Sequence, residues 1–145
     1  MHEVAATPLP KIELDLKSLA AEVIARAVKA GATDAEAVVS EGDEFSVSVR
    51  MGEVETLQES GSRGLGLRVF SGQRSASAST SDLTPDGIAQ LVSGAMALAK
   101  VTEEDAFAGL PEIADFGQLD GDLHLYYDDV YSLPAAERID RARRA

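Results

Sequence analysis

Residues 61–80, GSRGLGLRVFSGQRSASAST, decide the fold of this 145-residue chain. Within residues 65–69, large apolar side chains alternate with glycine or arginine, and a period of two is typical of an antiparallel strand that buries one face. Gly72 supplies turn chemistry, and residues 74–80 then form a second expected strand, built from small side chains. The stretch therefore predicts two antiparallel strands joined by a tight turn.

The same alternation continues upstream of this stretch. Apolar residues occupy every second position of residues 35–39 and 45–51, and residues 54–60 indicate a further strand. Gly42–Asp43 and Gly52–Glu53 are interpreted as turns between successive runs. All these runs together predict an antiparallel meander of about five strands.

One helix is expected before the strands in the chain and a second one after them. The first covers residues 16–30, where apolar residues recur at steps of three and four, with Asp15 as N-cap and Gly31 as its end. The second begins at Thr84, an N-cap that a proline follows at the first helical position. Glycines inside this second helix are interpreted as points of close packing against a neighbour: Gly87 and Gly94.

A third helix is predicted from about Ser132, with Pro134 in its first turn, and its pattern stops at Ala145 without a capping residue. The expected fold class is α+β: an antiparallel sheet of about five strands packed with two helices, plus a third C-terminal helix that is cut short. The expected organisation is a flexible lead-in, an α+β core, an acidic connector and the start of a helix that leads to an absent C-terminal domain: residues 1–13, 14–102, 103–131 and 132–145.

Composition and charge narrow the classes of function. With 45% hydrophobic and 26% charged residues, the composition is that of a soluble globular protein, and the lack of cysteine excludes disulfides and thiolate chemistry. The net charge of -12 argues against a direct nucleic-acid partner, which needs a basic face, and most of it lies in residues 103–129, with nine acidic residues and no basic one. No membrane-length apolar run or secretory signal is visible, so we expect a cytoplasmic location and no membrane partner.

The sequence offers no clear catalytic or metal centre. It contains two histidines, no Gly-x-Ser-x-Gly elbow and no His-Glu-x-x-His pair. One local cluster could supply metal ligands, within a connector where Leu123–Tyr126 suggests an edge strand. Hydrated acids are the favoured interpretation of this cluster over metal ligation. Its members are Asp120, Asp122, His124, Asp128 and Asp129.

The glycine-rich run at residues 61–66 leaves two interpretations open. It lacks both nucleotide-binding patterns, and a strand follows it where phosphate binding would use a helix N-terminus. The favoured interpretation is that the glycines pack beneath a helix. The alternative is a glycine-lined face approached by an extended peptide, whose carbonyls or carboxylate Arg63 and Arg68 would hold.

Two further groups of residues could form surfaces. Residues 74–80 leave so little bulk that a helix, another subunit or a ligand could lie on them, and coverage by the second helix is favoured. A serine nucleophile is a poor interpretation there, because activation needs an adjacent base. The three tyrosines suit either an interface or a plug over the domain's own core: Tyr126, Tyr127 and Tyr131.

Several of these stretches occur together in one known family. The runs GATDAEAVVSEGDEFSVSVRMGEVETLQESGSRGLGLRVFSGQRSASASTSDLTPDGIAQLV and AKVTEEDAFAGLPE resemble the N-terminal region of the TldD/PmbA family, also called the modulators of DNA gyrase. The resemblance covers roughly Leu14 to Ala145 and leans toward the PmbA (TldE) branch. Its most specific part is the glycine-lined strand, the small-residue strand and the Ser-Asp-Leu-Thr-Pro helix start.

The resemblance implies the N-terminal domain of a metal-dependent peptidase system. Family members are much longer, and the TldD branch carries a zinc-binding His-Glu-x-x-x-His motif in a C-terminal domain that is absent here. The resemblance further implies dimers, with a TldD-like partner subunit or a second copy, that act on unfolded or small peptides. No catalytic or metal-binding residue transfers to this chain. The positions that match the family's glycine-rich strand are inferred to bind peptide or form an interface: Arg63, Gly64, Gly66 and Arg68.

The functional hypothesis is a non-catalytic domain that contributes to dimer assembly and guides peptide substrate for proteolysis or peptide maturation. Zinc is implied for the catalytic domain of the family complex and no cofactor for this chain. The alternative is a self-standing protein-interaction module without enzymatic activity.

Overall fold

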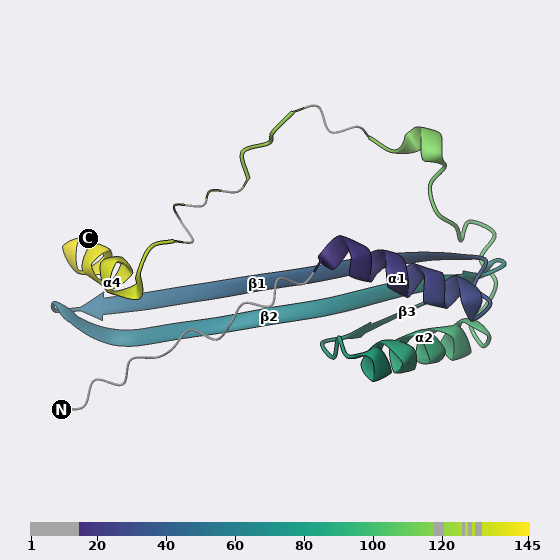
Figure 1. Cartoon of the computed structure of the whole chain (residues 1–145), viewed down its shortest axis with the longest axis horizontal. Coiled ribbons are helices and arrows are strands. Elements are labelled where there is room, and N and C mark those ends of the chain that lie inside the picture. The colour runs from purple at the N-terminus through teal and green to yellow at the C-terminus, as the bar shows by residue number, and fades with distance from the viewer. Residues whose placement is uncertain (1–14, 118–120, 126, 128, 130–131) are drawn as a thin grey trace.

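The structure is a computed structural model that describes residues 15–117, 121–125, 127, 129 and 132–145. Three antiparallel strands form one sheet in the order β1-β2-β3, and helices flank it (Figure 1). The elements in chain order are α1 (Leu16–Lys29), β1 (Asp34–Arg50), β2 (Glu53–Ser71), β3 (Arg74–Thr80), α2 (Pro85–Ala99), a 3₁₀ turn η1 (Ile113–Asp115) and α4 (Ala135–Arg144).

The α+β class is confirmed, but the expectation of about five strands is wrong for the described residues. The runs on either side of Gly42–Asp43 form one continuous strand, because Gly42 stays in extended backbone and pairs with Ser62. Residues 53–71 likewise form one strand. Turn residues end a strand only where the backbone leaves the extended region, and along this hairpin that happens at Met51 and Gly52, with φ of 53° and 82°.

The helix ends predicted from the sequence are confirmed. The Asp15 carboxylate accepts the N–H of Ser18 at 3.1 Å, and Gly31 closes α1 with a φ of +106°. The Thr84 hydroxyl oxygen accepts the N–H of Gly87 at 3.2 Å. Two hydrogen bonds from Thr84, one from its hydroxyl and one from its N–H, hold the pKa of the Asp82 carboxyl below its ordinary value.

The two glycines inside α2 differ in their surroundings. A Cβ at Gly87 would lie 2.5 Å from Asp82 atoms, so close packing is confirmed there. At Gly94 a Cβ would meet nothing within 4 Å, so the same interpretation is wrong. Nothing in the structure explains the glycine at position 94.

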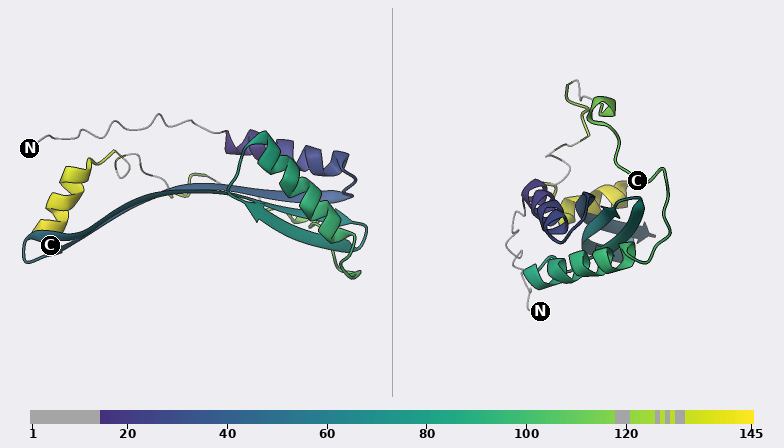
Figure 2. Two further views of the ribbon diagram at one scale, coloured as in Figure 1. Left: turned by 90° about the horizontal axis from the view of Figure 1, so that it is seen from below. Right: turned by 90° about the vertical axis from the view of Figure 1, so that its right-hand side faces the viewer.

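The hydrophobic core lies between one face of the sheet and the two helices α1 and α2 (Figure 2). Strand β2 contributes to this core the alternate residues that the sequence predicted to be buried. These are Leu65, Leu67 and Val69, and all three are nearly inaccessible to solvent. Helix α2 supplies the largest helical share, with Ile88, Leu91, Val92, Ala95, Met96 and Ala99. We call this sheet face the inner face, and the part of the molecule formed by residues 15–40 and 63–100 the head.

Beyond the head, β1 and β2 continue as a two-stranded arm, residues 41–62. In the part of the chain that the structure describes, the arm has no third strand, because β3 ends opposite Leu65. Helix α4 contacts the arm, where the Arg138 guanidinium lies 5.0 Å from the centre of the Phe45 ring. The predicted third helix is thus present, but it begins at Ala135 rather than near Ser132, and Pro134 precedes its first residue instead of lying in its first turn.

Residues 103–117, the described start of the connector between α2 and α4, arch away from the sheet (Figure 1). The predicted edge strand at Leu123–Tyr126 is wrong for Leu123–Leu125, which form no strand, and Tyr126 lies outside the described residues. His124 adopts a φ of 52°, which is incompatible with extended pairing.

Candidate functional site

The candidate site is the face of the head sheet that points away from the helices, which we call the outer face. Pairing places Val38, Gly66 and Ser79 side by side across the three strands. One step along, Glu36, Arg68 and Ser77 form the next row. Alternation produces this surface, because the residues before and after each buried inner residue on the same strand point to the opposite face.

The outer-face glycines lie in open surroundings. A Cβ at Gly66 would meet only the Val38 carbonyl oxygen, at 3.9 Å, and a Cβ at Gly64 would meet the Ser40 hydroxyl oxygen at 3.6 Å. Among the described residues, no atom of α1, α2 or α4 lies within 4 Å of either position. The favoured interpretation, that the glycines pack beneath a helix, is therefore wrong. The structure leaves these two glycines partly exposed along the middle strand.

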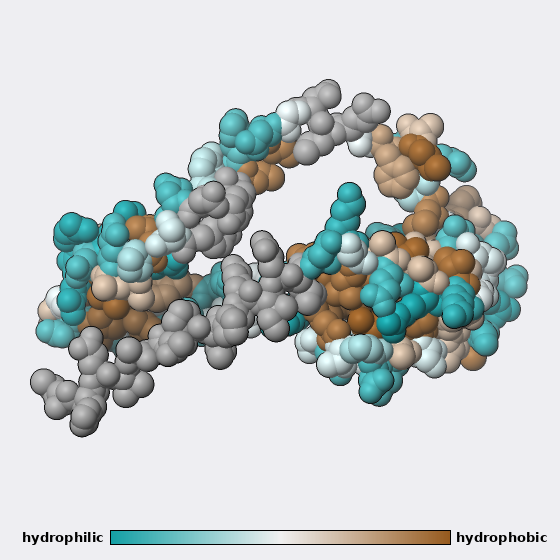
Figure 3. Space-filling view, in the orientation of Figure 1, coloured by the Kyte–Doolittle hydropathy of each residue, from teal (hydrophilic) through white to brown (hydrophobic). Residues whose placement is uncertain are grey.

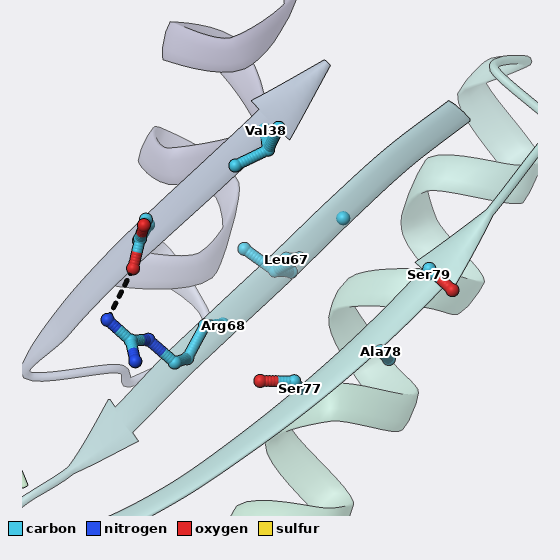
Figure 4. A pocket seen from close by; sticks show the side chains of 8 residues that line it. Val38, Leu67, Arg68, Ser77, Ala78 and Ser79 are labelled. Atoms are coloured by element: carbon cyan, nitrogen blue, oxygen red, sulfur yellow. Dashed lines mark hydrogen bonds and ion pairs between the residues drawn. The ribbon is translucent and has the colours of Figure 1, made fainter. Parts of the chain in front are cut away.

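These glycines make the outer face shallowly concave (Figure 4). A hollow of about 450 Å³ lies over the Gly66 row, and a second of about 640 Å³ continues toward the arm. Val38 stands at the boundary of both and is 61% exposed, which is high for a large aliphatic side chain. The first hollow is lined by Glu36, Val38, Gly66, Leu67, Arg68, Ser77, Ala78 and Ser79.

Arg68 is the fixed charge at one end of the hollow. Its Nη2 lies 2.5 Å from Glu36 Oε2, and its guanidinium lies 5.1 Å from the centre of the Phe70 ring. Both contacts hold the side chain along the strand while leaving it 44% exposed. A guanidinium carries five N–H donors, so donors remain for a carbonyl or carboxylate above the sheet.

Arg63 lies apart from this group. It alternates in phase with Leu65 and Leu67, whose side chains face the helices, although the residue borders the second hollow. The structure therefore gathers Gly64, Gly66 and Arg68 on the outer face and directs the Arg63 side chain to the other side.

Sequence reasoning missed Glu36 and Val38 as members of this surface. Both occupy alternate positions of β1, which was a usable signal. Their neighbours across the sheet depend on register, however, and the false turn at Gly42–Asp43 concealed it. The small-residue strand was interpreted correctly in one respect, since Ala76 and Ala78 face the core that α2 covers.

The acidic cluster does not fit a metal centre in the part of the chain that the structure describes. Asp122 and His124 are exposed neighbours, with His124 Nδ1 3.3 Å from Asp122 Oδ2, and Asp120 and Asp128 lie outside the described residues. No three His, Cys, Asp or Glu side chains among the described residues come together to hold an ion. Two exposed donors do not make a zinc site, which takes three or four.

The structure describes one of the three tyrosines of the connector. Tyr127 is more than half exposed, whereas Tyr126 and Tyr131 lie outside the described residues.

Among the helices that the structure describes, none combines the length and the apolar character needed to cross a membrane.

Comparisons with known proteins agree on one family. Residues 35–99 match the family model described as PmbA/TldA metallopeptidase domain 1. The chain is 37% identical over 116 residues to the metalloprotease PmbA homolog of Haemophilus influenzae, a match that covers 79% of this chain and 25% of that protein. It is 40% identical over 91 residues to metalloprotease PmbA of Escherichia coli O157:H7, covering 61% and 20%. The chain thus spans at most a quarter of the length of these curated relatives.

Solved structures share the fold. A proposed modulator of DNA gyrase from Bacteroides thetaiotaomicron superposes with a TM-score of 0.80 at 22% identity, over 88% of this chain and 29% of that one. TldE from Thermococcus kodakarensis gives a TM-score of 0.60 at 17% identity, over 85% and 28%. At these identities the likeness establishes the architecture alone.

Proposed function

This chain belongs to the PmbA/TldD metallopeptidase family, whose first domain it contains, and on that premise we propose that it is a non-catalytic domain that guides extended peptide and contributes to dimer assembly. The chemistry would lie elsewhere in the complex, with zinc bound by a catalytic domain. The complex would act in the cytoplasm on unfolded or small peptides, with a TldD-like subunit or a second copy as partner.

The observation that carries the proposal is the uncovered outer face. Gly64 and Gly66 leave the middle strand without side chains, so the backbone of an extended peptide can approach the sheet closely. Arg68 lies at the end of this side-chain-free stretch of β2, where it pairs with Glu36 and stays partly exposed. A flat strand surface that ends at a cationic side chain suits recognition of backbone carbonyls or a carboxylate, independent of peptide sequence.

Small side chains would also allow the outer face to serve as a subunit contact. Ser77 and Ser79 belong to β3, an edge strand, so a partner can reach both the face and the edge. A surface so low in bulk permits close approach of another sheet. Arg63, whose side chain is in phase with the inner residues Leu65 and Leu67, would take no part in an interface through the outer face.

Arg68→Ala in the full-length complex tests the peptide-guiding role. We expect the kcat/KM for an unfolded peptide to fall about tenfold to a hundredfold, since hydrogen bonds to charged groups contribute about 1.5–3 kcal/mol. The matched control is Arg50→Ala, which removes an exposed arginine that is paired with Glu55 at the arm tip. Wild-type turnover by the Arg68 variant, with unchanged unfolding temperature, would return Arg68 to a structural role.

Assembly is tested separately by size-exclusion chromatography of the full-length protein with and without a TldD-like subunit. A complex that survives dilution supports the proposal. Absence of both hetero- and homodimer would favour the alternative, a self-standing interaction module without an enzymatic partner. Chelation should abolish peptide cleavage by the complex without altering the melting temperature of this domain.

A further inference from the structure

The connector after α2 exposes large apolar side chains in an acidic setting. We call residues 103–117 the proximal connector. Its apolar residues recur every third position, and two of them, Phe107 and Ile113, are 95% and 85% exposed. The other two are Leu110 and Phe116. Figure 3 shows apolar surface on the arch around η1, away from the head. A connector that contacted only water would gain nothing from large apolar side chains at these positions.

The start of the proximal connector is fixed to the head. Arg74 donates to the Thr102 carbonyl oxygen at 2.8 Å and its Nη2 lies 3.3 Å from Glu104 Oε1. The N–H of Asp105 donates to the carbonyl oxygen of Gln73, in the β2–β3 turn, at 2.8 Å. The connector therefore leaves the head at a defined point and in a defined direction, immediately before Phe107.

The charge of the proximal connector indicates the chemistry of its partner surface. It carries five acidic residues and no basic one, and the acids flank the apolar positions on both sides. Burying such a segment against another acidic surface would be repulsive. A complementary surface has an apolar floor and lysine or arginine at its rim.

We propose that the proximal connector docks onto the polypeptide that follows residue 145 in the full-length protein, on an apolar surface with a basic rim. The Haemophilus and Bacteroides relatives are about three to four times longer than the part that matches, so the same polypeptide can supply that surface. The inference rests on family membership and is independent of the peptide-guiding role of the outer face.

Site-specific photocrosslinking in the full-length protein tests the docking. A benzophenone amino acid replaces Phe107 in one variant, Ile113 in a second and, as control, the exposed Gln90 of α2 in a third. We expect the first two to crosslink within one polypeptide to residues beyond 145, near lysine or arginine, at least about fivefold more than the control. Mass spectrometry of the digested adducts identifies the sites.

Three outcomes would overturn the proposal. Crosslinks that join two polypeptides would assign the connector to a partner subunit. Crosslinks confined to residues before 145, or yields no higher than that of the Gln90 control, would mean that nothing beyond the domain covers it. A gene that ends at codon 145 would also overturn it. None of these outcomes depends on peptide turnover.

Proteolysis provides a second readout that needs no unnatural residue. Residues 103–129 contain no lysine or arginine, so a protease that cuts after aromatic residues is used, with Phe107 and Phe116 as sites. Ile113→Ser should make cleavage of the full-length protein at Phe116 about tenfold faster, because the docked segment is released. The control Leu98→Ser, at a half-exposed position of α2, should leave the rate unchanged. Equal rates in wild type and Ile113→Ser would contradict docking.

Discussion

The head and the arm are two halves of the same β1–β2 hairpin, yet only the head has a core. In the head, alternate residues such as Leu65 and Leu67 are almost completely buried. In the arm, Phe45 and Val47 occupy equivalent alternate positions and are only half-buried, while Leu57 is 49% exposed. The strands do not cause the difference. Two long helices and β3 cover the head, whereas the arm has two strands and the short helix α4.

Alternation therefore decides which face of a strand is apolar, and coverage decides whether that face becomes a core. A two-stranded ribbon is marginal alone, and packing of α4 on the arm offsets only part of its exposure. We expect the arm to open without unfolding the head, and substitutions in the two halves to differ accordingly.

The largest effect is expected for Leu67→Ala in this 145-residue chain. Removing a fully buried leucine from the head should lower the free energy of unfolding by about 2–5 kcal/mol, measured by urea denaturation. The matched substitution in the arm, Leu57→Ala, should cost about 0.5 kcal/mol or less, because half of that side chain is already exposed. Equal costs would show that the arm is as well packed as the head.

A second comparison uses the two glycines of α2. Gly87→Ala should destabilise the head by about 1–3 kcal/mol, since its Cβ would collide with Asp82. Gly94→Ala should instead stabilise by up to about 1 kcal/mol, because the space is open and alanine favours a helix. Urea midpoints of both variants check the signs. Two destabilising results would mean that Gly94 also packs closely.

The third effect is confined to the arm. Phe45→Ala removes the ring beneath the Arg138 guanidinium, an interaction of about 0.5–1 kcal/mol, and should increase amide hydrogen exchange in α4 about threefold. Exchange in α2 should stay unchanged. The control Phe107→Ala removes an aromatic ring that is almost fully exposed and should leave α4 unaffected. Faster exchange throughout the head would show that the two halves open together.

The smallest effect concerns pH. Hydrogen bonds from the Thr84 hydroxyl and N–H lower the pKa of Asp82 below its ordinary value of 3.8, so the carboxylate form is favoured in the folded state. This contribution is present above the ordinary pKa and is lost as pH falls through the lowered folded pKa. The urea midpoint of wild type should therefore exceed that of Asp82→Asn at about pH 6, and the difference should shrink toward about pH 2.5. A constant difference would contradict the charge-dependent contribution.

Much of the head was predictable because its signals are local. The caps at Asp15 and Thr84, the turn at Gly72 and the burial of Leu65 each depend on a few neighbouring residues, and each is found as expected. The strand number was not predictable from the same signals, because Gly42–Asp43 has turn composition but lies in a continuous ladder. Pairing with Ser62 and its neighbours outweighs the local preference there.

The candidate site shows the same division. Gly64, Gly66 and Arg68 were identified from the sequence, and alternation alone placed them on one face. That Glu36 pairs with Arg68 could not be found without the register. That the face is open, rather than covered by a helix, depended on which side α1 and α2 occupy.

The sequence by itself determined the α+β class, the family, the helix ends and the alternate faces of the strands, because these follow from spacing, caps and composition. The tertiary structure alone decided that β1 and β2 are long continuous strands, that the glycines lie on an uncovered face and that the arm has no core of its own. Each depends on the free energy of contacts between residues far apart in the chain, and that free energy cannot be obtained from a local sequence pattern.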